Sequence, residues 1–112
     1  MLVGDETSVA VAAALEVERP GLVSAVLHAD DEAAARAAAD SVGLRRVDVV
    51  PRDDARAAAE RVVERRASAP DATVALTGGA PWVVATREAL RAKGVEKVKT
   101  KTYWVPGKTG LD

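Results

Sequence analysis

The segment Met1-Leu2-Val3-Gly4-Asp5-Glu6-Thr7 opens the chain with a short apolar run and a glycine, and a helix rich in Val and Ala follows. We interpret it as the end of a strand that turns through Gly4 into that helix. Such a turn places free backbone N–H groups at one point, where they can bind an anion. In α/β domains this point is usually the ligand site. Whether it holds a ligand here depends on the rest of the chain.

Strands and helices alternate along the sequence. We expect strands at 2–3, 22–28, 47–50, 72–76 and 97–105. We expect helices at 7–18, through 33–39 to the glycine at 43, from a cap at 53 or 54 to about 67, and a last one that has Pro81 near its start and ends at the glycine at 94. Asp30 or Asp31 is expected to cap the second helix, and Asp53 or Asp54 the third. This alternation predicts an α/β fold, a three-layer α/β/α sandwich with a five-stranded parallel sheet.

Right-handed crossovers favour a doubly wound sheet, for which we predict the strand order 3-2-1-4-5. The order reverses between the first and fourth strands, which lead into 4–7 and 77–79. The two glycine-containing turns would then face each other across a crevice that can hold a dinucleotide. Only three residues precede Gly4, whereas strands usually have about five or six. We therefore favour a chain cut from a longer one over a naturally short strand.

Composition limits the function classes. A length of 112 residues predicts a single domain, 1–112. The absence of cysteine excludes disulfides, iron–sulfur clusters and thiolate zinc sites, and a single histidine argues against a His-based metal site or a Ser-His-Asp triad. A net charge of −1 gives no general attraction to nucleic acid or to acidic membranes. We see no signal peptide or membrane-spanning run, so the cytoplasm is the expected compartment.

Four segments together resemble a known family: Gly4-Asp5-Glu6-Thr7, Val49-Val50-Pro51-Arg52, Leu76-Thr77-Gly78-Gly79 and Tyr103-Trp104-Val105-Pro106-Gly107. They are similar to the C-terminal, NAD(P)H-binding half of siderophore-interacting proteins, which are flavin-dependent ferric-siderophore reductases of the ferredoxin-reductase superfamily. The resemblance extends over nearly the whole chain. Its most specific parts are the G-D-E-T start and the Y-W-x-x-G end.

The resemblance implies a Rossmann-like domain of the ferredoxin-reductase type. Hydride passes from NAD(P)H to FAD, and electrons then pass to ferric iron held by a siderophore. The FAD of such enzymes sits on a β-barrel domain that this chain lacks, so a flavin-binding partner in cis or in trans is implied. Because the cofactors carry the chemistry, we expect no catalytic residue here and little turnover by the isolated chain.

The alternative is a non-catalytic domain that keeps the fold as an interaction or regulatory module. The missing barrel favours it, as does Gly79, which stands where many family members have Glu. A flavodoxin-like or receiver-like domain is a weaker option. The hydroxyl-rich FMN loop of the first and the phospho-accepting acidic pocket of the second are not visible in the sequence.

By resemblance, the residues Gly4, Asp5, Glu6 and Thr7 correspond to the phosphate loop of the superfamily. Thr7 and the helix amides would hold the pyrophosphate, and Gly4 would let the backbone approach it. Two carboxylates beside a pyrophosphate repel it unless they turn away. The other interpretation is that Asp5 and Glu6 stabilise the helix start through its dipole.

Arg52 follows the third strand and matches a basic position of the family. There it would meet the adenosine ribose and, with NADPH, the 2′-phosphate, for which a guanidinium is well suited. The other interpretation is a surface arginine paired with Asp53 or Asp54.

Two further segments are implied near the nicotinamide and the flavin. Thr77, Gly78 and Gly79 would allow the two rings to come close, because glycine has no Cβ. Tyr103 and Trp104 would close the site beside the flavin. The alternatives are a tight turn for the first segment and cover for the sheet edge for the second.

The remaining candidates have simpler interpretations. Lys97, Lys99 and Lys101 recur at a period of two, which is typical of lysines that protect an edge strand from other chains. A minority interpretation is that they attract an anionic ferric siderophore. We expect His28 to be structural or solvent-facing, and Trp82 to serve packing.

Overall fold

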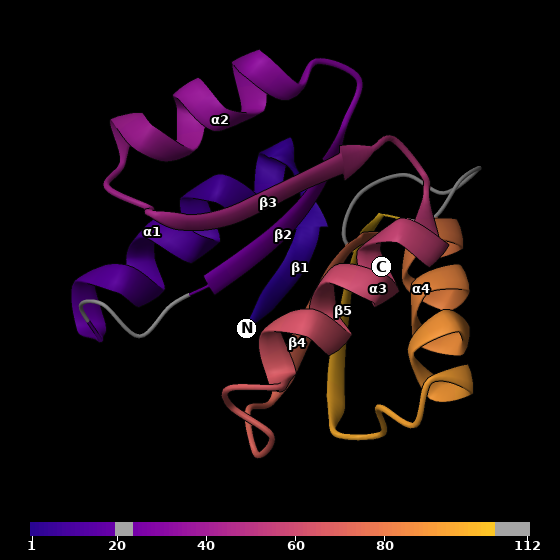
Figure 1. Cartoon of the computed structure of the whole chain (residues 1–112). Coiled ribbons are helices and arrows are strands. Elements are labelled where there is room, and N and C mark those ends of the chain that lie inside the picture. The colour runs from indigo at the N-terminus through magenta and orange to yellow at the C-terminus, as the bar shows by residue number, and fades with distance from the viewer. Residues whose placement is uncertain (20–23, 105–112) are drawn as a thin grey trace.

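The computed structural model describes the backbone of residues 1–19 and 24–104 and the side chains of 1–19 and 24–100. Within these residues the strands are β1 (Leu2–Asp5), β2 (Ser24–Ala29), β3 (Arg46–Pro51), β4 (Val74–Gly79) and β5 (Val98–Trp104). They pair in parallel as one sheet in the order β3-β2-β1-β4-β5 (Figure 1). The predicted α/β fold and strand order are confirmed.

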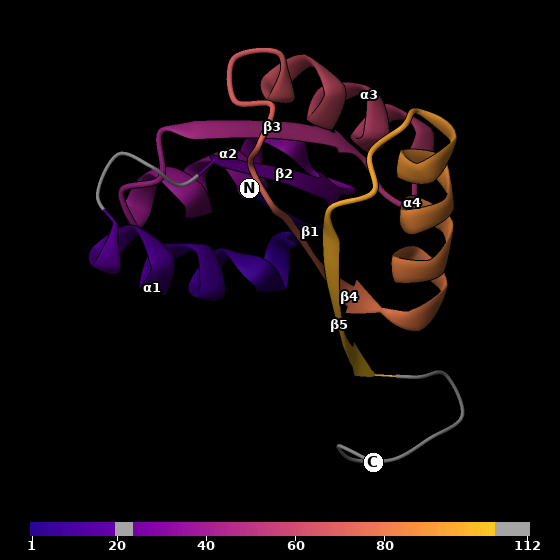
Figure 2. The ribbon, with the colours of Figure 1, turned by 90° about the horizontal axis from the view of Figure 1, so that it is seen from below.

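Helices connect the strands and cover both faces of the sheet. They are a 3₁₀ turn η1 (Glu6–Ser8) and the α-helices α1 (Val9–Glu18), α2 (Glu32–Ser41), α3 (Ala55–Arg66) and α4 (Ala80–Ala92). Helices α1 and α2 lie on one face, and α3 and α4 on the other, which makes three layers (Figure 2). None of the helices in the described residues is long and apolar enough to cross a membrane.

Two apolar cores hold the layers together. Leu2 and Val3 are neighbours on β1, and their side chains enter opposite cores because successive residues of a strand point to opposite faces. Leu2 packs with Leu27 beneath α1 and α2, whereas Val3 packs with Leu76 on the side of α3 and α4. Burial of each such side chain stabilises the fold by about 1.5–3 kcal/mol.

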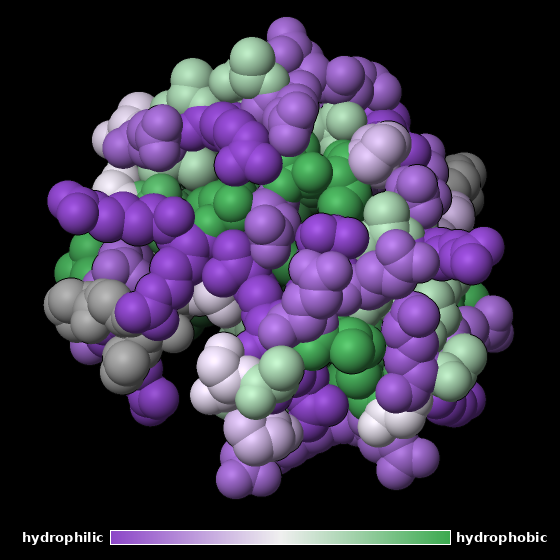
Figure 3. Space-filling model, in the orientation of Figure 1, coloured by the Kyte–Doolittle hydropathy of each residue, from purple (hydrophilic) through white to green (hydrophobic). Residues whose placement is uncertain are grey.

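Charged residues lie on the outer surface. On α3 they form pairs one turn apart, such as Arg56–Glu60 at 3.5 Å and Arg61–Glu64 at 3.1 Å. Hydrophilic side chains cover most of the face seen in Figure 3, and apolar residues show only in patches between them.

Aspartates begin α2 and α3, as the sequence predicted. Of each pair of candidates, the second is the cap: Asp31 accepts a hydrogen bond from the Ala34 amide at 3.0 Å, and Asp54 accepts one from the Ala57 amide at 2.9 Å. A carboxylate in this position satisfies one of the otherwise unpaired N–H groups of the first turn.

The prediction that Gly4 lies in a turn is wrong. Strand β1 continues through Gly4, which pairs with Leu27, and ends at Asp5. A Cβ on Gly4 would lie 2.3 Å from Ser8 Oγ and 2.6 Å from Thr77 Oγ1, so glycine is required by close packing within the protein. The first helical turn is also 3₁₀ rather than α-helical.

Strand β4 likewise extends beyond the predicted end at residue 76, through Thr77 and Gly78 to Gly79. Its register with β5 shifts between Gly78 and Gly79, and β5 forms the edge of the sheet. The prediction of a final edge strand is confirmed. Both glycine segments are therefore strand ends, and the helices begin after them.

Candidate functional site

A pocket of about 490 Å³ lies at the carboxyl ends of the strands, where the strand order reverses between β1 and β4. Its size is in the range of small-molecule sites, and its position is the one at which doubly wound sheets bind ligands. Residues at or just after the ends of β1, β2, β3 and β4 and from the first half of α4 line it: Asp5, His28, Arg52, Asp53, Gly79, Pro81, Trp82 and Ala85.

The two predicted glycine segments meet beside this pocket. Strands β1 and β4 are neighbours, and the hydroxyls of Ser8 and Thr77 are hydrogen-bonded at 2.8 Å. Both side chains are buried, at 0% and 5% exposure. They occupy the space beside Gly4, so Gly4 does not offer its backbone to a ligand on that side.

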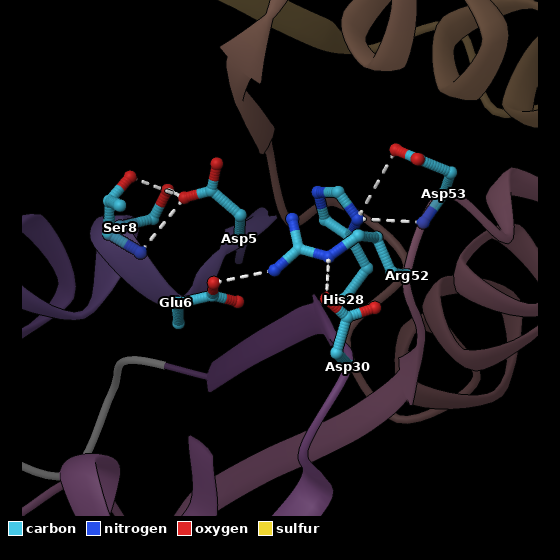
Figure 4. A network of polar contacts seen from close by, with 8 residues as sticks. Asp5, Glu6, Ser8, His28, Asp30, Arg52 and Asp53 are labelled. Atoms are coloured by element: carbon cyan, nitrogen blue, oxygen red, sulfur yellow. Dashed lines mark hydrogen bonds and ion pairs between the residues drawn. The ribbon is translucent and has the colours of Figure 1, made fainter. Parts of the chain in front are cut away.

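The carboxylate of Asp5, at the end of β1, is hydrogen-bonded to the residues that directly follow it. Asp5 is the N-cap of η1, and its Oδ1 accepts a hydrogen bond from the Thr7 amide at 2.9 Å. The same oxygen accepts the hydroxyl of Thr7 and, at 3.5 Å, that of Ser8 (Figure 4). The Thr7 amide and hydroxyl, which the resemblance assigned to a pyrophosphate, are therefore already hydrogen-bonded to Asp5.

Arg52 forms ion pairs with residues from two neighbouring strand ends. Its Nη2 lies 2.7 Å from Glu6 Oε1, and its Nε lies 2.8 Å from Asp30 Oδ2 (Figure 4). The alternative that Arg52 pairs with Asp53 or Asp54 is thus wrong. The hydrogen bonds to Glu6 and Asp30 raise the pKa of the guanidinium above its usual value. A phosphate that binds Arg52 must compete with two carboxylates.

His28 and Trp82 stack on each other at the pocket. Their ring centroids are 3.7 Å apart and their planes differ by 14°. His28 Nδ1 accepts a hydrogen bond from the Asp53 amide at 2.9 Å, and Asp53 has a left-handed backbone with φ of 59°. This bond assigns the proton of the neutral imidazole to Nε2. Burial lowers the pKa of His28 and outweighs the nearby Asp5 and Asp53, which raise it.

Two N–H donors of this stack lack a partner. His28 Nε2 and Trp82 Nε1 are both buried, and neither has a hydrogen bond among the described residues. The residues themselves are only 3% and 5% exposed. Buried donors in native proteins are nearly always paired, so a group that brings an acceptor to either one would satisfy it.

The turn after β4 differs from the turn after β1 because no side chain caps its helix. The N-cap of α4 is Gly79, which has no side-chain hydrogen bond to offer. Gly78 has φ of 129°, and a Cβ there would lie 3.0 Å from Trp82 Cδ1. Glycine at 78 thus allows both the backbone conformation and the close approach of the indole.

The sequence predicts a packing role for Trp82, and Trp82 does belong to the apolar core; His28 is buried and hydrogen-bonded, which agrees with a structural role. The sequence did not predict that the two rings stack and line the pocket. They are the single histidine and one of two tryptophans in a chain with 3% aromatic residues. Their positions, at the end of β2 and the start of α4, follow from the predicted strand order, and that was the available signal.

The last candidates lie on or beside β5. Tyr103 and Trp104 belong to the backbone of this strand, and Trp104 pairs with Gly79 next to the pocket. Their side chains, like that of Lys101, lie outside the described residues. Lys97 donates a hydrogen bond to the Asp71 carbonyl at 3.1 Å.

Among the described side chains, the charges at the site are mostly negative. Asp5 and Asp53 line the pocket, and Glu6 and Asp30 engage Arg52, its one lining arginine. In the part of the chain that the structure describes, no three His, Cys, Asp or Glu side chains gather as a metal ion would require. Comparisons with protein-family models, with curated proteins and with solved structures gave no match for this chain.

Proposed function

We propose that this chain is the NAD(P)H-binding domain of a flavin-dependent ferric-siderophore reductase and works in the cytoplasm. It positions the nicotinamide for hydride transfer to FAD held on another domain or chain. The observation that carries the proposal is the pocket of about 490 Å³ at the carboxyl ends of β1 and β4. Dinucleotides bind at this place in doubly wound sheets.

The ion-paired side chains of Glu6, Arg52 and Asp30 support binding of the adenosine half of the dinucleotide at this end of the pocket. Asp30 directly follows β2, where an acidic side chain in Rossmann domains accepts hydrogen bonds from the ribose hydroxyls. Arg52 lies 2.8 Å from it and can turn to a 2′-phosphate. The same group thus offers an acceptor for the ribose of NADH and a cation for the 2′-phosphate of NADPH.

The nicotinamide end lies beside β4 and α4. Bound NAD(P)H supplies the hydride and FAD accepts it. Gly79 lines the pocket at the end of β4 without a side chain, and Pro81 and Ala85 from α4 contribute an apolar wall. The work of the chain is to bind and orient the nicotinamide ring and to exclude water from one face of it.

A second candidate function is a non-catalytic interaction or regulatory module. The carboxylate of Asp5 favours it, because that carboxylate already occupies the amide and hydroxyl of Thr7. A domain whose phosphate loop binds its own side chain has less affinity for a pyrophosphate. Nucleotide titration discriminates between the two functions.

The test is calorimetry and thermal unfolding of the full chain with NADH, NADPH and ADP-ribose at millimolar concentration. A ligand that binds the folded state raises Tm by mass action. We expect a rise with all three, and ADP-ribose tests the adenosine end without the nicotinamide. Absence of stabilisation by every nucleotide would overturn the proposal in favour of the interaction module.

Substitution of Arg52 sharpens this test. We expect Arg52→Ala to weaken NADPH about tenfold and NADH far less, because only NADPH has the 2′-phosphate. Arg56→Ala is the matched control, since Arg56 is an 88% exposed arginine of α3 with a single partner, Glu60, in the described residues. Equal losses for the two nucleotides in Arg52→Ala would remove the phosphate role of this residue.

A further inference from the structure

The unpaired donors of the His28–Trp82 stack border the same end of the pocket as a carboxylate oxygen. Asp5 uses Oδ1 to cap η1, and its second oxygen, Oδ2, lies 3.8 Å from the position of a Cβ on Gly78. Trp82 Nε1 lies 3.6 Å from that same position. In Figure 4 one nitrogen of the His28 ring contacts Asp53, and the other nitrogen lies on the side of the ring that faces Asp5. Two N–H donors and one carboxylate oxygen thus border one end of the pocket.

This arrangement is complementary to a primary amide. An amide presents a carbonyl oxygen, which accepts from N–H groups, beside an NH₂ group, which donates to a carboxylate. We propose that His28 Nε2 and Trp82 Nε1 bind the carbonyl, and Asp5 Oδ2 the NH₂, of an aromatic amide. Both nitrogens are covered in this structure, so binding requires the stacked rings to turn far enough to expose them.

The pocket also selects the charge of the ring that carries the amide. Asp5 and Asp53 line it, and Arg52 is held by Glu6 and Asp30. This excess of negative charge attracts a cationic ring and repels a carboxylate. Pro81 and Ala85 offer an apolar wall to the face of the ring. The ligand class is therefore a neutral or cationic heteroaromatic amide, which under the proposed function is the nicotinamide carboxamide.

Four small probes separate the contributions of the amide carbonyl, the amide NH₂ and the charge of the ring. The 1-methylnicotinamide cation and nicotinamide both have the amide, 3-acetylpyridine keeps the carbonyl but lacks the NH₂, and nicotinate carries a carboxylate. We expect the cation to bind most tightly and nicotinamide next. 3-Acetylpyridine should bind about ten- to a hundredfold more weakly than nicotinamide because it loses one hydrogen bond to a charged group. Nicotinate should not bind.

The measurement is the indole N–H signal of Trp82 in a ¹⁵N-correlated NMR titration of the full chain at tens of millimolar ligand. The chain has two tryptophans, and W104F identifies the signal of Trp82 by elimination. A shift of this signal that follows the order of the probes supports the proposal. A signal that moves equally with nicotinamide and nicotinate, or with neither, overturns it.

Two variants test the individual partners. Trp82→Phe removes one donor and keeps a stacking ring, so nicotinamide should bind about fivefold more weakly. Asp5→Asn keeps the cap of η1, because asparagine also caps helices, and replaces Oδ2 with an NH₂ donor. The preference should then move from nicotinamide towards nicotinate. An unchanged order of affinities in Asp5→Asn contradicts the role of Asp5.

ADP-ribose separates this inference from the proposed function on which it rests. Binding of ADP-ribose without an effect of nicotinamide on Trp82 overturns the amide subsite and leaves the dinucleotide function standing. Binding of nicotinamide without ADP-ribose supports the subsite and contradicts the dinucleotide function. If neither binds, both are wrong.

Discussion

The turns after β1 and β4 lie side by side at the same pocket, but their polar groups are used differently. After β1, the carboxylate of Asp5 caps the helix, and Ser8 and Thr77 occupy the space beside Gly4. After β4, the N-cap Gly79 offers no side chain, and the Trp82 indole N–H has no partner among the described residues.

The difference shows that a glycine at the end of a strand does not by itself make a binding loop. In the first turn the glycine serves packing, and the donors are paired within the protein. In the second turn Gly78 makes room for the Trp82 indole, and the N–H donors of Trp82 and His28 have no partner among the described residues. Donors that lack a hydrogen bond within the protein therefore indicate a ligand site better than the position of a glycine does.

The largest effect is expected from filling the space beside the first turn. Gly4→Ala places a Cβ 2.3 Å from Ser8 Oγ, and we expect it to lower the free energy of unfolding by about 2–3 kcal/mol, as overpacking does. The control is Gly43→Ala, where φ is +81° and no atom lies within 4 Å, so only backbone strain of about 1 kcal/mol is expected. Urea unfolding measures both. Equal losses would contradict the packing role of Gly4.

A smaller effect is expected from the protonation of His28. Burial lowers the pKa of this histidine in the folded chain, so the unfolded chain, with a pKa of about 6.5, takes up the proton first. Stability is therefore full above that value and falls as the pH drops towards the folded pKa. The loss between pH 7 and 6 is at most about 0.7 kcal/mol.

His28→Gln isolates this effect, because the carboxylates of the chain titrate in both proteins and their contribution cancels in the difference. We expect the variant to lose less stability than the parent chain between pH 7 and 6 in urea unfolding. A steeper or identical fall in the variant would show that His28 is not held neutral by the fold.

The fold could be predicted because its signals are local. Short apolar runs alternate with helical segments, and aspartates precede α2 and α3, so the sequence predicts the order of the elements; right-handed crossovers then favour this strand order. The choice between Asp53 and Asp54 as cap could not be made, because both fit the start of α3. It depends on the left-handed conformation of Asp53, whose amide is held by His28 from another strand.

The site was predictable only in part, because its contacts join residues far apart in the chain. The sequence indicated the place of Arg52 at the end of β3, but its partners Glu6 and Asp30 come from the ends of β1 and β2. The stack of His28 on Trp82 likewise joins β2 to α4. A search confined to neighbours in sequence cannot find such pairs.

The most direct test of the contrast between the two turns is a ¹⁵N-correlated NMR titration of the full chain with NADPH, in which every amide reports its own surroundings. We predict the largest shifts at the Trp82 indole N–H and the amides of Gly78 and Gly79, and smaller ones at the Thr7 amide, which Asp5 already binds. Shifts centred on Thr7 and Ser8 with Trp82 unmoved, or no shift at all, would contradict a ligand site on the side of β4 and α4.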